Sequence, residues 1–307
     1  MTGVLRIGTR GSPLARAQTE LACRALRQAD PALAGPGALE VVAIRTTGDR
    51  VSDRPLAELG GKGMFCKELE AALLERRIDL AVHSMKDLPT WLPAGLAIGA
   101  MLPRADPRDV LIARQGPCRI DGLPKDAVVG TASLRRRAQL LARRPDLEIA
   151  TMRGNLETRL RKLEAGEVDA TLLARAGLDR LGVSPPGAML LEPDEMLPAV
   201  GQGAIGIECR ADAPLRALLQ AVDDAPTSLC VAAERAMLEV LDGSCHTPIA
   251  GHARIEEGRM RLRGLVARPD GSRAHAAEQE APVADGERLG REVGEQLRRR
   301  AGPGFFD

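Results

Sequence analysis

The chain has 307 residues, 44% of them hydrophobic, which is enough for two or three ordinary domain cores. Its 43 Lys and Arg nearly balance its 42 Asp and Glu, so no overall basic field would attract nucleic acid or an anionic membrane. Three Phe, one Trp and no Tyr leave few rings on which single-stranded nucleic acid could stack.

The first part of the chain is predicted to form an α/β unit. Ser12 and Pro13 have the pattern of an N-cap followed by proline at the first helical position, which places a helix at Leu14 to Ala29. Turn residues near 103–107 are predicted to end this α/β unit. The other predicted elements are strands 4–7, 39–46, 78–82 and 96–101, and a helix at 67–77.

A second unit then repeats the alternation of strand and helix. Turn residues at 182–187 end it, and an apolar strand at 204–209 is predicted to return the chain to the first unit, so that two segments form a hinge. Its predicted elements are strands 109–113, 127–130, 147–152 and 168–174, and helices 134–144 and 156–164.

The C-terminal part is predicted to be a small α+β domain, with helices at 228–241 and 285–300 around strands near 249–255, 260–266 and 274–280. No G-x-G-x-x-G follows a predicted strand, and no G-x-x-x-x-G-K-[ST] occurs, so neither nucleotide-binding fingerprint is present. No apolar run resembles a signal peptide or a membrane span, which predicts a cytoplasmic protein that binds no membrane. The six cysteines contain no Cys-x-x-Cys and the four histidines no ligand spacing, so we expect no metal site and mostly buried thiols.

Lys86 and Asp87 follow the apolar run 78–82, which reads as a strand buried on both faces. Open α/β sheets keep their ligand crevice at the carboxyl ends of such strands, so Asp87 is a candidate acid or charge stabiliser. The alternative is a solvated ion pair at a turn before Pro89, and for an isolated strand end it is the commoner outcome.

Two arginine-rich segments follow predicted strands, at 130–137 and at 152–159. Each places hydroxyl or amide groups and guanidiniums at the start of a helix, where the helix dipole favours an anion. The planar two-pronged guanidinium suits carboxylates, and several carboxylates are the preferred ligand. Arg135, Arg136 and Arg137 cannot all face one ligand, because consecutive helical residues diverge by about 100°. At least one of them is expected to face solvent or protein.

Cys245 lies in a predicted loop, Leu241 to Pro248, between a helix and a strand. His246 beside it favours the nucleophilic thiolate. A purely structural loop cysteine is the alternative.

Taken in order, these segments resemble the porphobilinogen deaminase (hydroxymethylbilane synthase) family from end to end. The resemblance rests on the segments 6–15, 60–70, 83–89, 130–136, 153–159, 201–210 and 243–245. It implies an α/β fold of two domains like the lobes of type II periplasmic binding proteins, joined by a hinge, plus a small C-terminal α+β domain. The implied boundaries are 1–102 with 203–222, 103–202, and 223–307.

The resemblance also implies the reaction. In this family a dipyrromethane cofactor, built from the substrate, is held by a thioether to the cysteine that matches Cys245. Four porphobilinogen molecules are added in turn with loss of ammonia, and hydrolysis releases hydroxymethylbilane. The partner is therefore a small-molecule substrate and not nucleic acid, and a monomer is expected.

Residue roles are carried over position by position. Asp87 matches the catalytic aspartate, which first gives a proton to the departing amine and then balances the cation that remains. Each pyrrole carries an acetate and a propionate, so the growing chain demands many cations. The matching cofactor- and substrate-binding positions are Arg10, Ser12, Lys86, Thr131, Ser133, Arg135, Arg136, Arg153 and Arg159. Gln18, Phe65, Ser84 and Gln202 match further positions close to the cleft.

Two other functions remain as alternatives. A two-lobed binding protein for a polycarboxylate ligand explains the arginines and the hinge, but it predicts a secretion signal and no role for Cys245. A nucleic-acid-binding protein would use the arginines for phosphates, which the near-zero net charge and the scarcity of aromatic residues disfavour.

Overall fold

The computed structural model describes residues 4–50, 63–242 and 247–305. They divide into two units, which are described separately. The first comprises 4–50, 63–105 and 204–228, and the second comprises 106–203 and the described residues from 229 onward. The chain thus leaves the first unit after Ala105, returns at Ala204 and leaves again after Ser228. The predicted return of the chain through the strand near 204–209 is confirmed.

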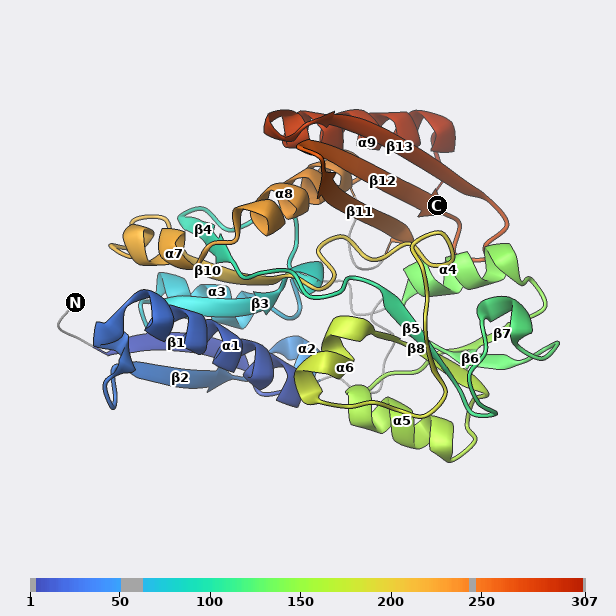
Figure 1. Ribbon diagram of the computed structural model, residues 1–307, viewed down its shortest axis with the longest axis horizontal. Helices are drawn as coiled ribbons and strands as arrows, with labels where there is room; N and C mark the ends of the chain where they lie inside the picture. Colours follow the sequence, from blue (N-terminus) through green and yellow to red (C-terminus); the bar gives the residue numbers. More distant parts are fainter. Residues whose placement is uncertain (1–3, 51–62, 243–246, 306–307) are drawn as a thin grey trace. The chain divides into compact units, whose positions relative to one another are not determined.

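A five-stranded sheet forms the centre of the first unit, in the order β2-β1-β3-β10-β4 (Figure 1). β1, β2 and β3 are parallel, whereas β10 is antiparallel to both of its neighbours. The carboxyl ends of β1 and β3 therefore share one edge of the sheet with the start of β10. The strands are β1 (Leu5–Arg10), β2 (Leu39–Ile44), β3 (Leu80–Ser84), β4 (Leu96–Met101) and β10 (Ile205–Arg210).

Helices cover both faces of this sheet, and β3 and β10 are therefore buried on both sides. α1 (Pro13–Ala29) and α7 (Arg216–Val222) bury residues such as Leu26 and Leu219 in one core. α3 (Lys67–Leu74) buries Leu69 and Leu73 in another. Shorter pieces are α2 (Thr47–Arg50) and the 3-10 turns η1 (Pro31–Ala34) and η3 (Met85–Asp87).

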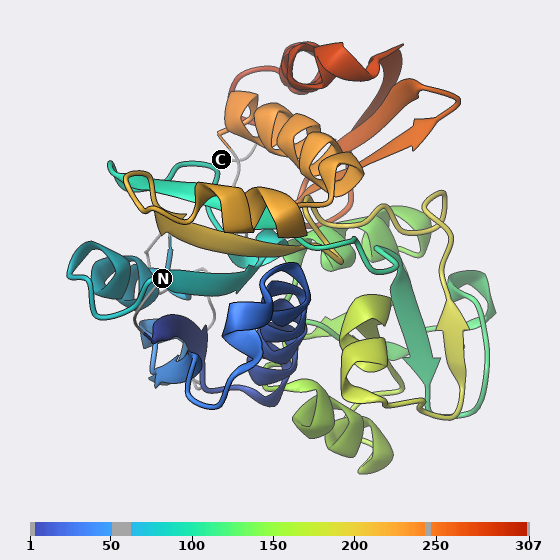
Figure 2. The same cartoon turned by 60° about the vertical axis from the view of Figure 1, so that its left-hand side comes forward.

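The second unit contains a sheet of the same design, in the order β7-β6-β8-β5-β9. Three strands are again parallel and the fourth, β5, is antiparallel; its pairing with β9 can be followed in green and yellow in Figure 2. The strands are β5 (Asp109–Ala113), β6 (Val128–Gly130), β7 (Glu148–Ala150), β8 (Ala170–Ala174) and β9 (Ala188–Leu190). The helices are α4 (Leu134–Arg143), α5 (Leu156–Glu164), α6 (Arg175–Leu181) and the 3-10 turn η4 (Ile120–Gly122).

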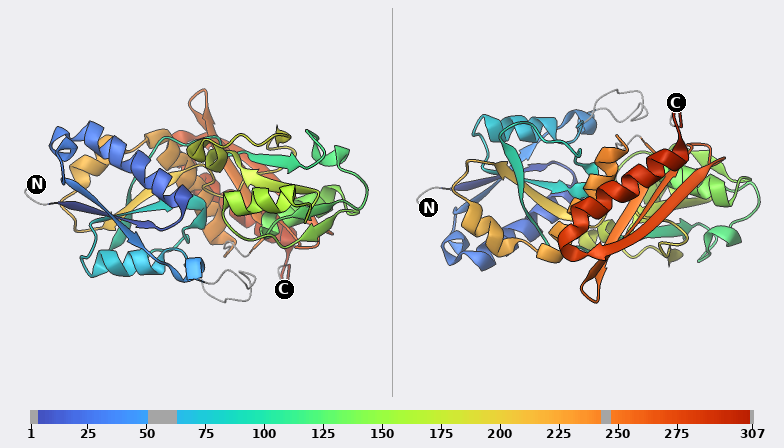
Figure 3. Two further views of the ribbon diagram at one scale, coloured as in Figure 1. Left: turned by 90° about the horizontal axis from the view of Figure 1, so that it is seen from below. Right: turned by 90° about the horizontal axis from the view of Figure 1, so that it is seen from above.

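The C-terminal part of the second unit is a three-stranded antiparallel sheet packed against two helices (Figure 3). Gly290 and Gly294 of α9 allow the helices to approach closely, because an added Cβ would lie 2.2 Å from the Ala233 carbonyl oxygen or 2.9 Å from that of Met237. The elements are α8 (Ala225–Val240), β11 (Ile249–Glu256), β12 (Arg259–Ala267), β13 (Ala274–Pro282), the 3-10 turn η5 (Val283–Asp285) and α9 (Gly286–Ala301).

The fold class expected from the sequence, two α/β domains and a small α+β domain, is confirmed. Strands 96–101 and 109–113 and helix 156–164 have the predicted bounds. The predicted strand 78–82 is shifted to Leu80–Ser84, because the end of α3 closes through a hydrogen bond from Ile78 N to the Ala72 carbonyl oxygen. In the described part of the chain, no helix is long and apolar enough to span a membrane.

Candidate active site

A cavity opens at the carboxyl edge of the first sheet, entirely within the first unit. Its lining includes seven of the residues singled out from the sequence: Arg10, Ser12, Gln18, Phe65, Ser84, Lys86 and Asp87. They come from β1, α1 and its N-cap, the segment before α3, the end of β3 and the turn that follows β3.

β1 and α1 place two of the polar groups. Arg10 is the last residue of β1, and Ser12 is the N-cap of α1. The Ser12 hydroxyl accepts a hydrogen bond of 3.2 Å from Ala15 N, and Pro13 follows at the first helical position, as predicted. A hydroxyl that accepts one hydrogen bond still has its own proton to donate. The start of α1 thus offers a donor to the same cavity that Arg10 lines.

Lys86 and Asp87 lie in η3, the 3-10 turn that directly follows β3. Met85 anchors this turn: its side chain is buried and its N–H donates to the Ala204 carbonyl oxygen at 3.1 Å. Leu88 N closes the turn by donating to the Met85 carbonyl oxygen at 3.3 Å. Both charged side chains line the cavity.

Phe65 lies beside the Arg10 guanidinium, whose carbon is 4.2 Å from the centre of the ring. Gly48 of α2 makes room for the ring, since an added Cβ would lie 2.2 Å from Phe65 Cε1. The cavity thus combines an aromatic face with a fixed cation. Such a wall suits a flat, carboxylated ring compound.

Four buried polar residues below the cavity were not singled out from the sequence. His83 and Cys66 line the cavity, and Glu70 and Glu208 lie behind them. Burial raises the pKa of the Cys66 thiol and that of Glu70. His83 and Glu208 fall in segments 83–89 and 201–210, on which the family resemblance rests. Those segments could therefore have pointed to both residues.

The second unit holds Arg135 and Arg136 on the first turn of α4, both buried. Arg135 Nη2 and Arg136 Nη2 each lie 2.8 Å from a different oxygen of Asp109. Burial alone would raise the pKa of Asp109, but the two guanidiniums lower it well below its usual range. Burial lowers the pKa of Arg135. Arg137 is exposed, in agreement with the expectation that the three arginines diverge.

Two arginines against one aspartate leave one positive charge in a buried place, which is costly unless an anion binds there. Arg136 Nε is buried with no hydrogen-bond partner among the described residues. The cluster of Arg135, Arg136 and Asp109 therefore fits a carboxylated ligand. Gln202 braces the cluster, because its amide nitrogen donates to Asp109 at 2.9 Å and to the Pro107 carbonyl oxygen at 2.6 Å.

Thr131 and Ser133 form the entry to α4. Ser133 is the N-cap, and its hydroxyl accepts from Arg136 N at 3.4 Å, while the Thr131 hydroxyl accepts from Ser133 N at 3.2 Å. Arg153 and Arg159 flank the start of α5 and are half-buried; Arg159 Nε donates to the Gly154 carbonyl oxygen at 3.0 Å. All four residues lie at the carboxyl ends of β6 and β7, as predicted.

Cys245 and its neighbours 243–246 lie outside the described residues. Among the described residues, no group of three His, Cys, Asp or Glu is placed to hold a metal ion. Of the described cysteines, Cys23, Cys66, Cys209 and Cys230 are buried, as predicted, and Cys118 is half-exposed.

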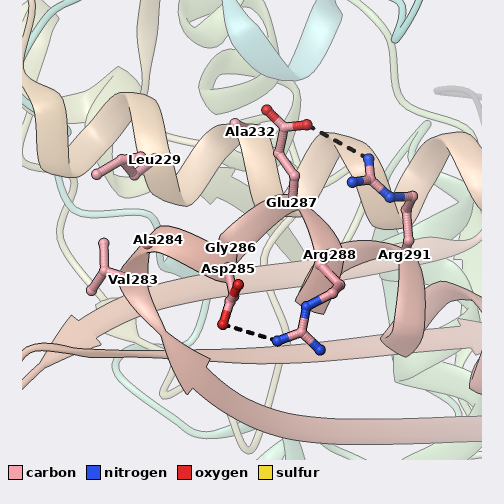
Figure 4. Close-up of a pocket in the computed structure, with 9 residues that line it drawn as sticks. All are labelled: Leu229, Ala232, Val283, Ala284, Asp285, Gly286, Glu287, Arg288 and Arg291. Atoms are coloured by element: carbon pink, nitrogen blue, oxygen red, sulfur yellow. Dashed lines mark ion pairs between the residues drawn. The ribbon is translucent and has the colours of Figure 1, made fainter.

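A second hollow of about 290 Å³ lies between α8 and the start of α9 (Figure 4). Its two arginines are paired with acids of its own lining: Arg288 with Asp285 at 2.9 Å and Arg291 with Glu287 at 3.6 Å. Its charges balance, so it lacks the excess of cations that a polycarboxylate ligand needs.

Comparison with known proteins shows the family of the chain. Residues 5–216 match the family model described as "Porphobilinogen deaminase, dipyromethane cofactor binding domain", and residues 228–299 match "Porphobilinogen deaminase, C-terminal domain". A porphobilinogen deaminase of Paracoccus denitrificans is 55% identical over 304 residues, covering 99% of this chain and 96% of the relative. A chloroplastic porphobilinogen deaminase of Oryza sativa subsp. japonica is 50% identical, covering 99% and 86%. The chain belongs to the porphobilinogen deaminase family.

Proposed function

We propose that this chain is a transferase that condenses four porphobilinogen molecules head to tail, with loss of ammonia, and releases hydroxymethylbilane. The observation that carries the proposal is the cavity of the first unit, where one carboxyl group, Asp87, lies with the cations Arg10 and Lys86. This cavity belongs to the segment that matches the cofactor-binding family model. The match supports an enzyme and not the alternative of a two-lobed binding protein.

Asp87 is the acid and the countercharge in this proposal. Its carboxyl group gives a proton to the substrate amine, the C–N bond breaks with its electrons passing to nitrogen, and ammonia leaves. The carboxylate that remains balances the positive charge on the pyrrole. When the new carbon–carbon bond has formed, the pyrrole ring carbon that made the bond as the nucleophile loses its proton to the same carboxylate. Asp87 thereby returns to its starting form.

The dipyrromethane cofactor of this family supplies an anchored pyrrole chain to which new units are joined. Cations outnumber acids among the described residues of the cavity and of the Asp109 cluster, which fits the carboxylates of this cofactor. We assign Arg10, Ser12 and Lys86 in the first unit to carboxylate binding. In the second unit we assign Thr131, Ser133, Arg135, Arg136, Arg153 and Arg159 to the same role. Gln18, Phe65 and Ser84 shape the cavity, and Gln202 braces Arg135 and Arg136 through Asp109.

We further propose three domains with the boundaries given above, a monomer in solution and a cytoplasmic location. Separate hydrophobic cores in the first α/β part, in the second and around α8, α9 and β11–β13 support the three domains. Size-exclusion chromatography with light scattering tests the monomer.

The experiment that tests the function is intact-mass measurement with peptide mapping, combined with a porphobilinogen turnover assay. We expect active protein to carry the dipyrromethane mass on the peptide that contains Cys245. Cys245→Ser should lose both the added mass and the activity, whereas the matched control Cys118→Ser should keep both. Active protein with an unmodified Cys245 would overturn the assignment.

A further inference from the structure

His83 and Glu208 form a buried pair at the cavity, which His83 helps to line. His83 Nε2 lies 2.8 Å from Glu208 Oε2, and the two side chains are 5% and 0% exposed. This hydrogen bond between the ring and the carboxyl group fixes the orientation of the His83 ring. The other carboxylate oxygen, Glu208 Oε1, is buried with no partner among the described residues.

The pair joins the two strands at the place where the catalytic turn begins. Glu208 lies in β10, and His83 is the penultimate residue of β3, three positions before Lys86. His83 lies opposite Gly206 in the ladder, and an added Cβ on Gly206 would lie 2.2 Å from Met85 Sδ. Met85 fills this space and starts the turn that carries Lys86 and Asp87. A small shift of β3 against β10 would therefore move both charged residues.

Stability alone is a poor explanation for this pair. A buried histidine–carboxyl pair contributes little over apolar residues of the same volume, because both groups lose their hydration. A second acid, Glu70, is also buried here. Burial raises the pKa of Glu70, and the charge of Glu208 raises it further, so this region disfavours additional negative charge. At the other end of β3, the ion pair of Asp79 with Arg6 and Arg210 already joins the strands in a more exposed position.

We propose that Glu208, acting through the His83 ring, is a positioning residue that fixes the end of β3 and so holds Lys86 and Asp87 toward the substrate. The proposal rests on the proposed deaminase function. Neither residue takes part in proton transfer to the substrate. Because a misplacement of about 1 Å can cost about 100-fold in rate, the pair should influence the chemical step rather than substrate affinity.

The test compares Glu208→Gln, His83→Gln and the double variant in holoenzyme whose cofactor content has been confirmed by mass. Each single variant should lower kcat by about 10- to 100-fold with KM changed less than about twofold. If the two residues act as one unit, the double variant should be no slower than the slower single variant. Asp79→Asn is the matched control: it weakens the link between the same two strands at the opposite end, so it should lower the melting temperature and leave kcat unchanged.

Wild-type kcat in both single variants, additive losses, or an effect confined to KM would overturn the proposal. If Glu208→Gln does not fold, His83→Gln alone decides by the same criteria. Failure of both variants to fold would assign the pair a purely structural role and also overturn it. Absence of porphobilinogen turnover in the wild-type protein would instead contradict the proposed function, so the two failures are distinguishable.

Discussion

Asp87 is the only carboxyl group among the described residues that line the cavity. Asp87→Asn keeps the size of the side chain but can neither donate a proton nor balance a cation. We expect it to fold and to slow ammonia release in a single turnover by at least about 100-fold. Rapid-quench measurement of ammonia gives the rate. A near-normal single-turnover rate would contradict the role of Asp87.

Asp109 is the counterion of two buried arginines. Asp109→Asn would leave both guanidiniums without a negative partner, so we expect the free energy of unfolding at pH 7 to fall by about 3–5 kcal/mol. Urea unfolding measures this change. In the matched control, Asp121→Asn, the exposed ion pair with Arg143 is lost, and a much smaller effect is expected.

The effect of Asp109 should depend on pH. Its pKa in the folded protein lies below the ordinary value of about 3.9, because the two arginines outweigh burial. Its contribution is therefore fully present above about pH 4 and is lost as the pH falls toward the folded pKa. The difference between wild type and Asp109→Asn should shrink in urea unfolding below pH 4. A difference that grows on acidification would contradict this sign.

At the scale of elements, the sequence predicted most strands and helices, including the three-residue strands β6 and β7, but it missed α6, α7 and β9. α1 was predictable because Ser12 and Pro13 mark its start, and β5 because its five residues are all buried. α6 and α7 were missed because neither Ala174 nor Leu215 provides a side-chain cap, and β9 was missed because its three residues directly follow the turn residues 182–187. The Asp109 cluster was not predictable in detail, since it depends on Gln202 lying beside β5, 93 positions away in the chain.

Gly206 sets how closely β10 and β3 support the catalytic turn. Gly206→Ala forces Met85 to move, because the new Cβ would lie 2.2 Å from its sulfur. We expect overpacking to cost about 1–3 kcal/mol in urea unfolding and kcat to fall by about tenfold. Gly35→Ala is the control, since its nearest atom would be 3.9 Å away. Wild-type kcat in a folded Gly206→Ala protein would show that the turn tolerates this shift.

Over the whole molecule, each unit presents cations whose positive charge a carboxylated cofactor would neutralise. Arg10 and Lys86 line the cavity of the first unit, and Arg135 and Arg136 share one carboxylate in the second. A ligand that binds the folded protein and not the unfolded chain stabilises it. The anchored cofactor should therefore raise the stability of the whole chain as well as prime the reaction.

Cys245→Ser, which cannot form the thioether, tests this coupling. We expect its melting temperature to lie about 5 °C or more below that of wild-type protein that carries the cofactor, with Cys118→Ser unchanged. Amide hydrogen exchange near Arg10–Ser12 should be faster than in wild type, because the cations of the cavity lose their ligand. Equal melting temperatures, or unchanged exchange near Arg10–Ser12, would show that the cofactor does not stabilise the protein through these cations.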